Sequence, residues 1–193
     1  MASKKELIIG FSRPKKWKPF SALIRWWDRV RYKSDIDVSH CYGRFHSSSW
    51  ERDFIYQSAG LRSHFMGGHR FQSINECVEE YRIKVSNECL IKIGQVCIDR
   101  EGKPYAIKQT FGLVIKGLVW LGTCGRKTIR NPFADGDAET NCIEEWGRIL
   151  SQELNLDLPS DMDSSSVKPF RDWIRSLDIS EQIDPCPNRH KAG

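Results

Sequence analysis

The order in which strand-like and helix-like patterns of apolar residues follow one another is the feature that most constrains the fold of this chain. Short segments rich in β-forming residues predict strands at 6–12, 38–45, 52–60 and 78–85. Apolar residues at helical spacing predict helices that begin at Pro19, near Asn87, at Cys142 and at Pro169. We therefore expect the α+β class, with an antiparallel sheet packed against helices.

The length of 193 residues suits one compact domain with an appendage. Seven Trp, nine Phe and a hydrophobic fraction of 39% are enough for a substantial core. The stretch NLDLPSDMDSSS is polar and resembles a linker. We therefore predict one main domain over 1–155, followed over 156–193 by this linker, a short helix and a tail.

The apolar runs are too short for a membrane-spanning helix, which needs about 20 residues. The longest, FGLVIKGLVWLG at 111–122, contains Lys116. It predicts a buried helix or hairpin, with a surface that touches lipid as the alternative.

The N-terminus MASKKELIIGFSRPKK lacks the pattern of a secretory signal, and the seven cysteines include no C-x-x-C pair. We therefore expect a cytoplasmic location with reduced thiols.

Positive charge is concentrated near the N-terminus. Residues 1–33 carry ten Lys or Arg against Glu6 and Asp28, whereas the net charge of the whole chain is only +5. Aromatic residues such as Trp17 and Trp26 lie among these cations. The segment is therefore either a solvated face or a contact surface for an anionic partner, such as nucleic acid, anionic lipid or an acidic protein.

The stretch TNCIEEW singles out one of the seven cysteines. Asn141 is a good N-cap residue, and Glu144 follows three positions later, as in a capping box. Cys142 would then lie in the first helical turn, where free N–H groups and the helix dipole favour a thiolate. We therefore predict that Cys142 is the reactive thiol.

A cysteine nucleophile needs a base and a group that orients that base. His40 opens a predicted strand, and a hairpin between 38–45 and 52–60 would bring Gln57 beside it. Gln57 could then bond the imidazole, with Tyr56 on the opposite face of the strand. Spacing alone leaves a packing role open for each of these residues.

The chain contains no convincing metal or nucleotide motif. His64, His69 and Cys77 form the one loose cluster of ligand-type residues, and their spacing is unlike a structural zinc site. The sequence has no phosphate-binding glycine loop. We therefore predict neither a metal nor a cofactor.

The order of several short segments resembles the circularly permuted branch of the NlpC/P60 papain-like superfamily. These segments span roughly residues 6 to 150 and read LIIGFSR, SHCYGRF, FIYQSAG, YRIKV, GKPYAIKQTFG and TNCIEEW. The resemblance implies a permuted papain-like fold with Cys142 as nucleophile, His40 as base and Gln57 as the third polar residue. Ile143 stands where bacterial members often carry Ser, and Gln57 stands where they carry Glu or His.

The resemblance implies a cysteine hydrolase of the amidase or peptidase type. Its substrate would be a peptide, peptidoglycan or a lipid acyl group, the last because NCIE is also similar to the NCEHF of lecithin:retinol acyltransferase-like relatives. The short chain resembles phage-encoded members, so a virion-associated location is a further expectation. The alternative is a non-catalytic binding or assembly module that uses the basic aromatic N-terminal face. The oligomeric state is left open.

Overall fold

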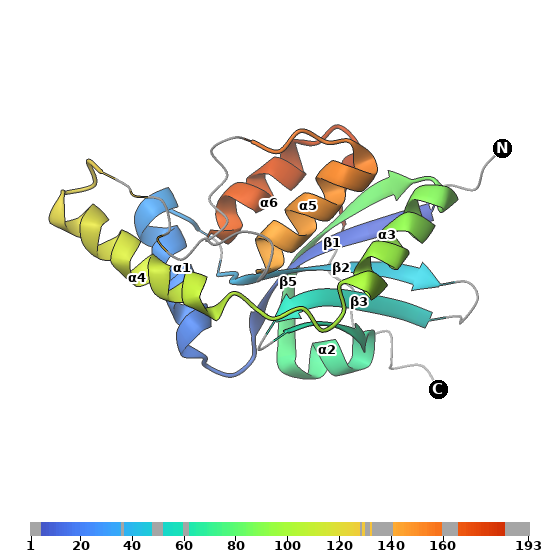
Figure 1. Cartoon of the computed structure of the whole chain (residues 1–193), viewed down its shortest axis with the longest axis horizontal. Coiled ribbons are helices and arrows are strands. Elements are labelled where there is room, and N and C mark those ends of the chain that lie inside the picture. The colour runs from blue at the N-terminus through green and yellow to red at the C-terminus, as the bar shows by residue number, and fades with distance from the viewer. Residues whose placement is uncertain are drawn as a thin grey trace.

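The computed structural model describes residues 5–35, 37–47, 52–59, 62–127, 129, 132, 141–159 and 166–183 (Figure 1). It has the predicted α+β class, with a six-stranded antiparallel sheet and, within these ranges, six helices. The strand order in the sheet is β4-β3-β2-β1-β5-β6. The strands are β1 (Lys5–Pro14), β2 (His40–Ser47), β3 (Arg52–Ala59), β4 (Arg62–Gly67), β5 (Asn75–Val85) and β6 (Ser180–Ile183).

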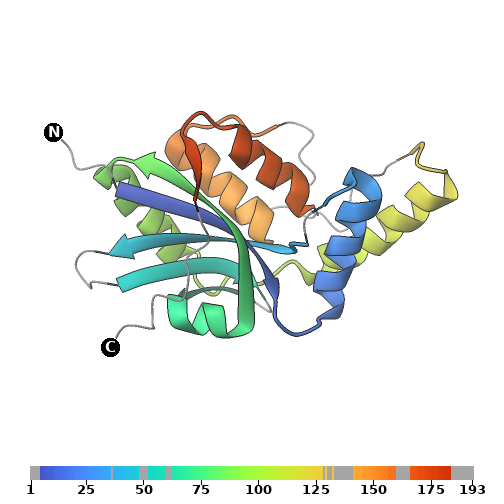
Figure 2. The same ribbon diagram turned by 180° about the vertical axis from the view of Figure 1, so that it is seen from behind.

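Helices cover both faces of the sheet, and two further helices project beyond one of its ends. The helices are α1 (Pro19–Tyr32), α2 (Gly68–Ile74), α3 (Asn87–Asp99), α4 (Ile107–Gly122), α5 (Cys142–Leu154) and α6 (Val167–Ser176). Apolar residues of α3, α5 and α6 share one buried core with β1, β2 and β5. Helix α2 contributes Phe71 to a smaller cluster with Tyr42, Ile55 and Met66. Helices α1 and α4 lie side by side and project from the end of the sheet (Figures 1 and 2).

A close contact between β2 and α5 brings the candidate nucleophile to the sheet. Gly43 lies at the centre of β2, and a Cβ atom there would stand 1.9 Å from the ring of Trp146. The missing side chain thus lets Trp146, which is fully buried, lie directly against the strand. Helix α5 is thereby held with its first turn beside the beginning of β2.

Several local predictions differ from the structure. Helix α3 is capped by Ser86, whose hydroxyl accepts the Cys89 N–H at 3.1 Å, and not by Asn87, which is the first helical residue. The last helix begins at Val167, two residues before the predicted start. Strand β4, helix α2 and strand β6 were not predicted.

The C-terminal part belongs to the same core and sheet as the rest of the chain. Helix α6 buries Val167, Phe170 and Ile174 in the main core, and β6 pairs with β5. Residues 160–165 and 184–193, which include part of the predicted linker and the predicted tail, lie outside the described residues.

Candidate active site

Helix α5 begins with the predicted cap. The Asn141 side-chain oxygen accepts the backbone N–H groups of Ile143 at 2.9 Å and Glu144 at 3.0 Å. The Asn141 amide in turn donates to Gln109 Oε1 at 2.9 Å, and Gln109 donates to the Glu144 carboxylate at 3.3 Å. A residue of α4 therefore holds the first turn of α5 from outside.

Cys142 is the first residue of α5, and its environment favours the thiolate. A side-chain hydrogen bond with Cys41 is the largest of the interactions that hold the pKa of Cys142 well below its usual range. The charge of the His40 imidazole and a side-chain hydrogen bond with His40 also lower this pKa. Together they outweigh burial, which raises the pKa. Cys41 also donates its thiol proton to the Cys142 backbone carbonyl at 3.0 Å.

Burial and the neighbouring Cys142 raise the pKa of Cys41 well above its ordinary value. These opposite shifts make Cys142 the more acidic thiol of the pair.

His40 is the first residue of β2 and is fixed by its partner on β3. Its Nε2 atom lies 2.7 Å from Gln57 Oε1. The Gln57 amide nitrogen lies 3.2 Å from Met66 Sδ, an acceptor, which supports this orientation of the amide. Since Oε1 can only accept, Nε2 carries the proton, and Nδ1 is then the nitrogen that can take a proton from Cys142.

Neighbouring side chains of β3 point to opposite faces of the sheet, as expected for a strand. Gln57 points to His40, whereas the hydroxyl of its neighbour Tyr56 donates to Glu145 of α5 at 2.8 Å. Glu145 is fully buried and also accepts from Arg100, the C-cap residue of α3, at 2.8 Å. Strand β3 therefore orients the candidate base on one face and anchors α5 on the other.

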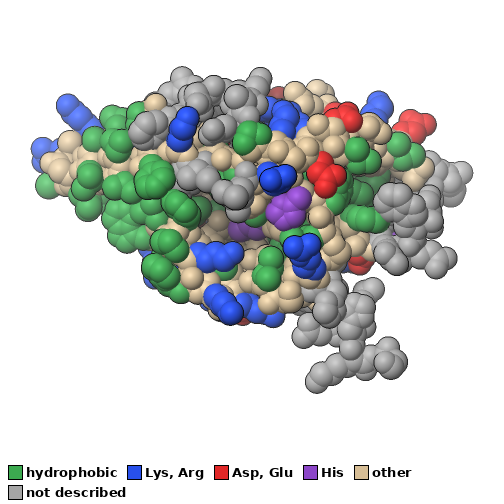
Figure 3. Space-filling view, turned by 60° about the horizontal axis from the view of Figure 1, so that its bottom comes forward, with side chains coloured by type: hydrophobic (Ala, Val, Ile, Leu, Met, Phe, Trp, Pro, Cys, Tyr) green, Lys and Arg blue, Asp and Glu red, His purple; other side chains and the backbone are tan. Residues whose placement is uncertain are grey.

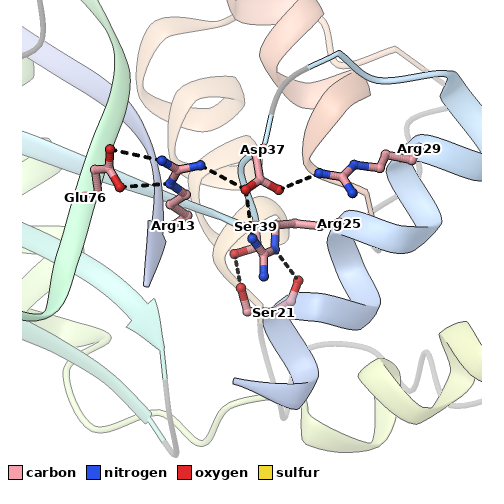
Figure 4. Close-up of polar contacts among 7 residues, drawn as sticks. All are labelled: Arg13, Ser21, Arg25, Arg29, Asp37, Ser39 and Glu76. Carbon is pink, nitrogen blue, oxygen red and sulfur yellow. Dashed lines mark hydrogen bonds and ion pairs between the residues drawn. The ribbon is translucent and has the colours of Figure 1, made fainter. Parts of the chain in front are cut away.

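A cluster of ion pairs holds the segment that leads into His40 (Figure 4). Asp37 accepts from three arginines, namely Arg13 of β1 at 2.9 Å and Arg25 and Arg29 of α1 at 2.9 and 3.1 Å. Burial alone would raise the pKa of Asp37, but the hydrogen bond from Arg13 and the charge of Arg25 lower it overall. Asp37 is therefore ionised and ties β1 and α1 together three residues before His40.

Ser39 adds a second constraint at the same place. Its hydroxyl hydrogen-bonds with Ser21 of α1 at 2.5 Å (Figure 4). Its backbone N–H donates to the Ser12 carbonyl of β1 at 3.1 Å. The residue directly before His40 is thereby fixed from two elements.

A cavity of about 280 Å³ opens at this end of the sheet, and histidine side chains are visible in the hollow in Figure 3. Its lining includes Lys18, Phe20, Ile24, His40, Gln57, His64 and Tyr105. Cys142 is not part of the lining, and only 3% of it is exposed. The cavity thus presents the base to solvent while the thiol is covered.

Tyr105 is a site residue that was not among the predicted ones. It lines the cavity, and burial, followed by the negative charges of Cys142 and Glu144, raises the pKa of its hydroxyl well above the ordinary value. The phenol is therefore a protonated donor in the neighbourhood of the thiolate. Its signal in the sequence was the GKPY motif, which was noted without a role for the tyrosine.

Of the other histidines considered as metal ligands, one lies at this site and one is not described. His64 lines the cavity, with its Nε2 3.4 Å from the Gln57 amide nitrogen, whereas the side chain of His69 lies outside the described residues. Within the described ranges no three His, Cys, Asp or Glu side chains are grouped to hold a metal ion. Among the described helices, none has the length and apolar character needed to cross a membrane.

Comparison with known proteins adds no assignment. No family model, curated protein or solved structure matches the chain.

Proposed function

We propose that this protein is a cysteine hydrolase of the amidase or peptidase type with a permuted NlpC/P60 papain-like architecture. Cys142 is the nucleophile, His40 the base, and Gln57 the residue that positions the base. The observation that carries the proposal is the chain of contacts from Gln57 through His40 to a Cys142 whose pKa is lowered. A nucleophile, a base and an orienting amide in this order are what acyl transfer by a thiol requires.

The chemistry follows from these positions. The Cys142 thiolate attacks the carbonyl carbon, a C–S bond forms, and the carbonyl electron pair moves to the oxygen. The tetrahedral intermediate collapses, its C–N or C–O bond breaks, and the His40 imidazolium protonates the leaving group. Water then attacks the thioester while His40 takes its proton, which releases the acid and restores the thiolate.

In this proposal, two groups donate hydrogen bonds to the oxyanion. The backbone N–H of Cys142 lies in the first turn of α5, where N–H groups lack helical partners. Tyr105, which lines the cavity together with His40, is the second proposed donor. The substrate class is an amide, a peptide bond such as those of peptidoglycan, or a lipid acyl bond.

The burial of Cys142 adds one requirement. Since Cys142 is buried and does not line the cavity, whereas His40, Gln57 and Tyr105 do, we expect a substrate carbonyl to reach the sulfur only after a lining side chain moves. Small electrophiles should therefore react faster with Cys142 than bulky ones of equal intrinsic reactivity.

Competitive alkylation with peptide mapping tests the proposal. At neutral pH, iodoacetamide should modify Cys142 faster than the exposed Cys124. The substitution His40→Ala should lower the alkylation rate of Cys142 without lowering that of Cys124. Equal rates for the two thiols in the wild type, or an unchanged rate at Cys142 in the variant, would contradict the proposed dyad.

A second function, contact with an anionic partner through the basic N-terminal face, is supported by a different observation. Lys15, Lys16, Trp17 and Lys18 are all exposed and precede α1 next to the cavity. This role is compatible with catalysis, since these side chains are not members of the Cys142–His40–Gln57 chain.

A further inference from the structure

Helix α4 exposes a stripe of apolar residues, whereas its opposite face buries two polar residues together with Leu113. A stripe at intervals of three or four residues lies on one face and is exposed, with Leu118 exposed to 65%; this α4 stripe consists of Phe111, Val114, Ile115, Leu118 and Leu121. On the opposite face, Gln109 and Lys116 are buried, and the Lys116 ammonium lies 5.5 Å from the centre of the Trp27 ring. A helix at a water-facing surface normally has the reverse arrangement, so the stripe indicates an apolar environment on its outer side.

The apolar surface continues from α4 to α1 and reaches the cavity. The Phe111 ring packs edge-on against Phe20 of α1, with ring centres 5.6 Å apart. Phe20 also lines the cavity that contains His40, and Trp17 and Trp26 extend the exposed aromatic surface. Figure 3 shows hydrophobic side chains gathered over the end of the molecule formed by these two helices.

Cations border this surface at both ends of the helices. The exposed basic residues are Lys15, Lys16 and Lys18 before α1, and Arg126 and Lys127 after α4. The sequence contains no Asp or Glu within 7–27 or 102–134, so no acidic side chain of these segments offsets the cations. The surface therefore combines apolar contact with a uniform positive border.

The charge pattern decides between possible occupants. A second copy of the chain would bring two positive borders face to face, which is unfavourable. Nucleic acid would satisfy the cations but would leave the aliphatic residues of the stripe in contact with phosphates and water. The interface of an anionic bilayer offers acyl chains to the stripe and negative headgroups to the lysines.

We propose that the α4 stripe, together with Trp17, Phe20 and Trp26 of the α1 region, inserts into the headgroup region of an anionic membrane. The basic side chains then lie at the level of the lipid headgroups, and the mouth of the cavity opens at the membrane surface. Helix α4 lies in the plane of the interface and does not cross the bilayer. This inference concerns a binding surface and does not rest on the reactivity of Cys142.

Flotation of the full chain with lipid vesicles tests the apolar part of the proposal. Vesicles of phosphatidylcholine mixed with phosphatidylglycerol should bind the wild type at low salt. The double variant Leu118→Gln/Leu121→Gln should reduce partitioning at least about tenfold, because the buried apolar area is lost. The matched control Ile91→Gln/Ile98→Gln, which removes two exposed apolar residues of α3, should bind like the wild type.

A second pair of variants tests the electrostatic part. Lys15→Gln/Lys16→Gln should weaken binding about fivefold per lysine, and added salt should weaken binding of the wild type. The control Lys84→Gln/Lys92→Gln, on the exposed surface of β5 and α3, should leave binding unchanged. Alkylation of Cys142 measures the proposed catalytic site separately in every variant.

Three results would overturn the proposal. The first is no flotation of the wild type with anionic vesicles at low salt. The second is equal loss of binding in the stripe variant and its α3 control. The third is light scattering that shows a dimer of the wild type which the stripe variant abolishes, since the occupant would then be a second copy of the chain.

Discussion

The Nε2 atom of His40 lies 2.7 Å from Oε1 of Gln57, and this contact determines which imidazole nitrogen faces Cys142. The two residues come from adjacent strands, so the sheet itself sets the orientation of the candidate base. Gln57 is only 1% exposed, and its amide is held by Met66 as well. Gln57 is therefore held from within the protein, while His40 faces the cavity.

Loss of this contact should impair reactivity more than folding. In Gln57→Leu the imidazole loses its acceptor and can rotate, so we expect acylation of Cys142 to slow by roughly tenfold to a hundredfold. Gln57→Glu keeps an acceptor at the same position and should retain most of the rate. The measurement is the acylation rate as a function of pH, with thermal unfolding of both variants as the check on folding. A rate in Gln57→Leu equal to that of the wild type would remove Gln57 from the site.

Cys41 should set the acidity of Cys142. Its side chain is the largest of the influences that lower the pKa of Cys142, so Cys41→Ala should shift half-maximal alkylation of Cys142 to higher pH. Cys41→Ser keeps a donor and should give a smaller shift. Cys97→Ala is the control, because it removes a similar side-chain volume at another fully buried cysteine. It should leave the pH dependence of Cys142 alkylation unchanged. Identical pH profiles for Cys41→Ala and Cys97→Ala would contradict this role.

The helix cap at Asn141 should affect both stability and the thiol. Asn141→Ala removes the acceptor of two backbone N–H groups and should cost about 1 kcal/mol of unfolding free energy. It should also raise the pH of half-maximal Cys142 alkylation, because the first turn of α5 loosens. Ser86→Ala removes the cap of α3 and provides the control. We expect urea denaturation of Ser86→Ala to show a similar loss of unfolding free energy. The pH of half-maximal Cys142 alkylation should not change in this variant.

The acid side of the stability curve should depend on Asp37. Its pKa is lowered in the folded protein from an ordinary value of 3.8, so its ionised form stabilises the fold above that value. This contribution is lost as the pH falls through the lowered pKa of the folded state. Asp37→Asn should therefore lower the unfolding free energy at neutral pH. It should also make that free energy depend less on pH in the acid range. Asp35→Asn, at an exposed aspartate two residues away, should change neither.

The sequence predicted the parts of the site that depend on local chemistry. The cap at Asn141, the start of α5 at Cys142 and the pairing of the His40 and Gln57 strands follow from residue types and alternation. The contributions of Cys41 and Tyr105 were missed, because they depend on where α5 and the end of α3 meet the sheet. The arginines that hold Asp37 were missed for the same reason, since they come from two other elements.

The missed elements have identifiable physical causes. Strand β6 is a short, largely polar edge strand, so its sequence SEQI carries no alternating apolar signal. Strand β4 and helix α2 meet at adjacent glycines, Gly67 and Gly68, which are typical of a loop. The apolar run at 111–122 was expected to form a buried helix or hairpin. It lies in helix α4, and the helix exposes a stripe of apolar residues, because the sequence could not show which side of a helix faces the protein.

Intact-protein mass spectrometry with an activated acyl ester tests the central claim most directly. With p-nitrophenyl acetate at neutral pH, the wild type should gain one acetyl group, mapped to Cys142, and then lose it by hydrolysis. His40→Ala should gain the group far more slowly, and Cys142→Ala should not gain it at that site. Acetylation at Cys142 with the same rate in the wild type and in His40→Ala, or acetylation confined to other cysteines, would contradict the proposed Cys142–His40 hydrolase.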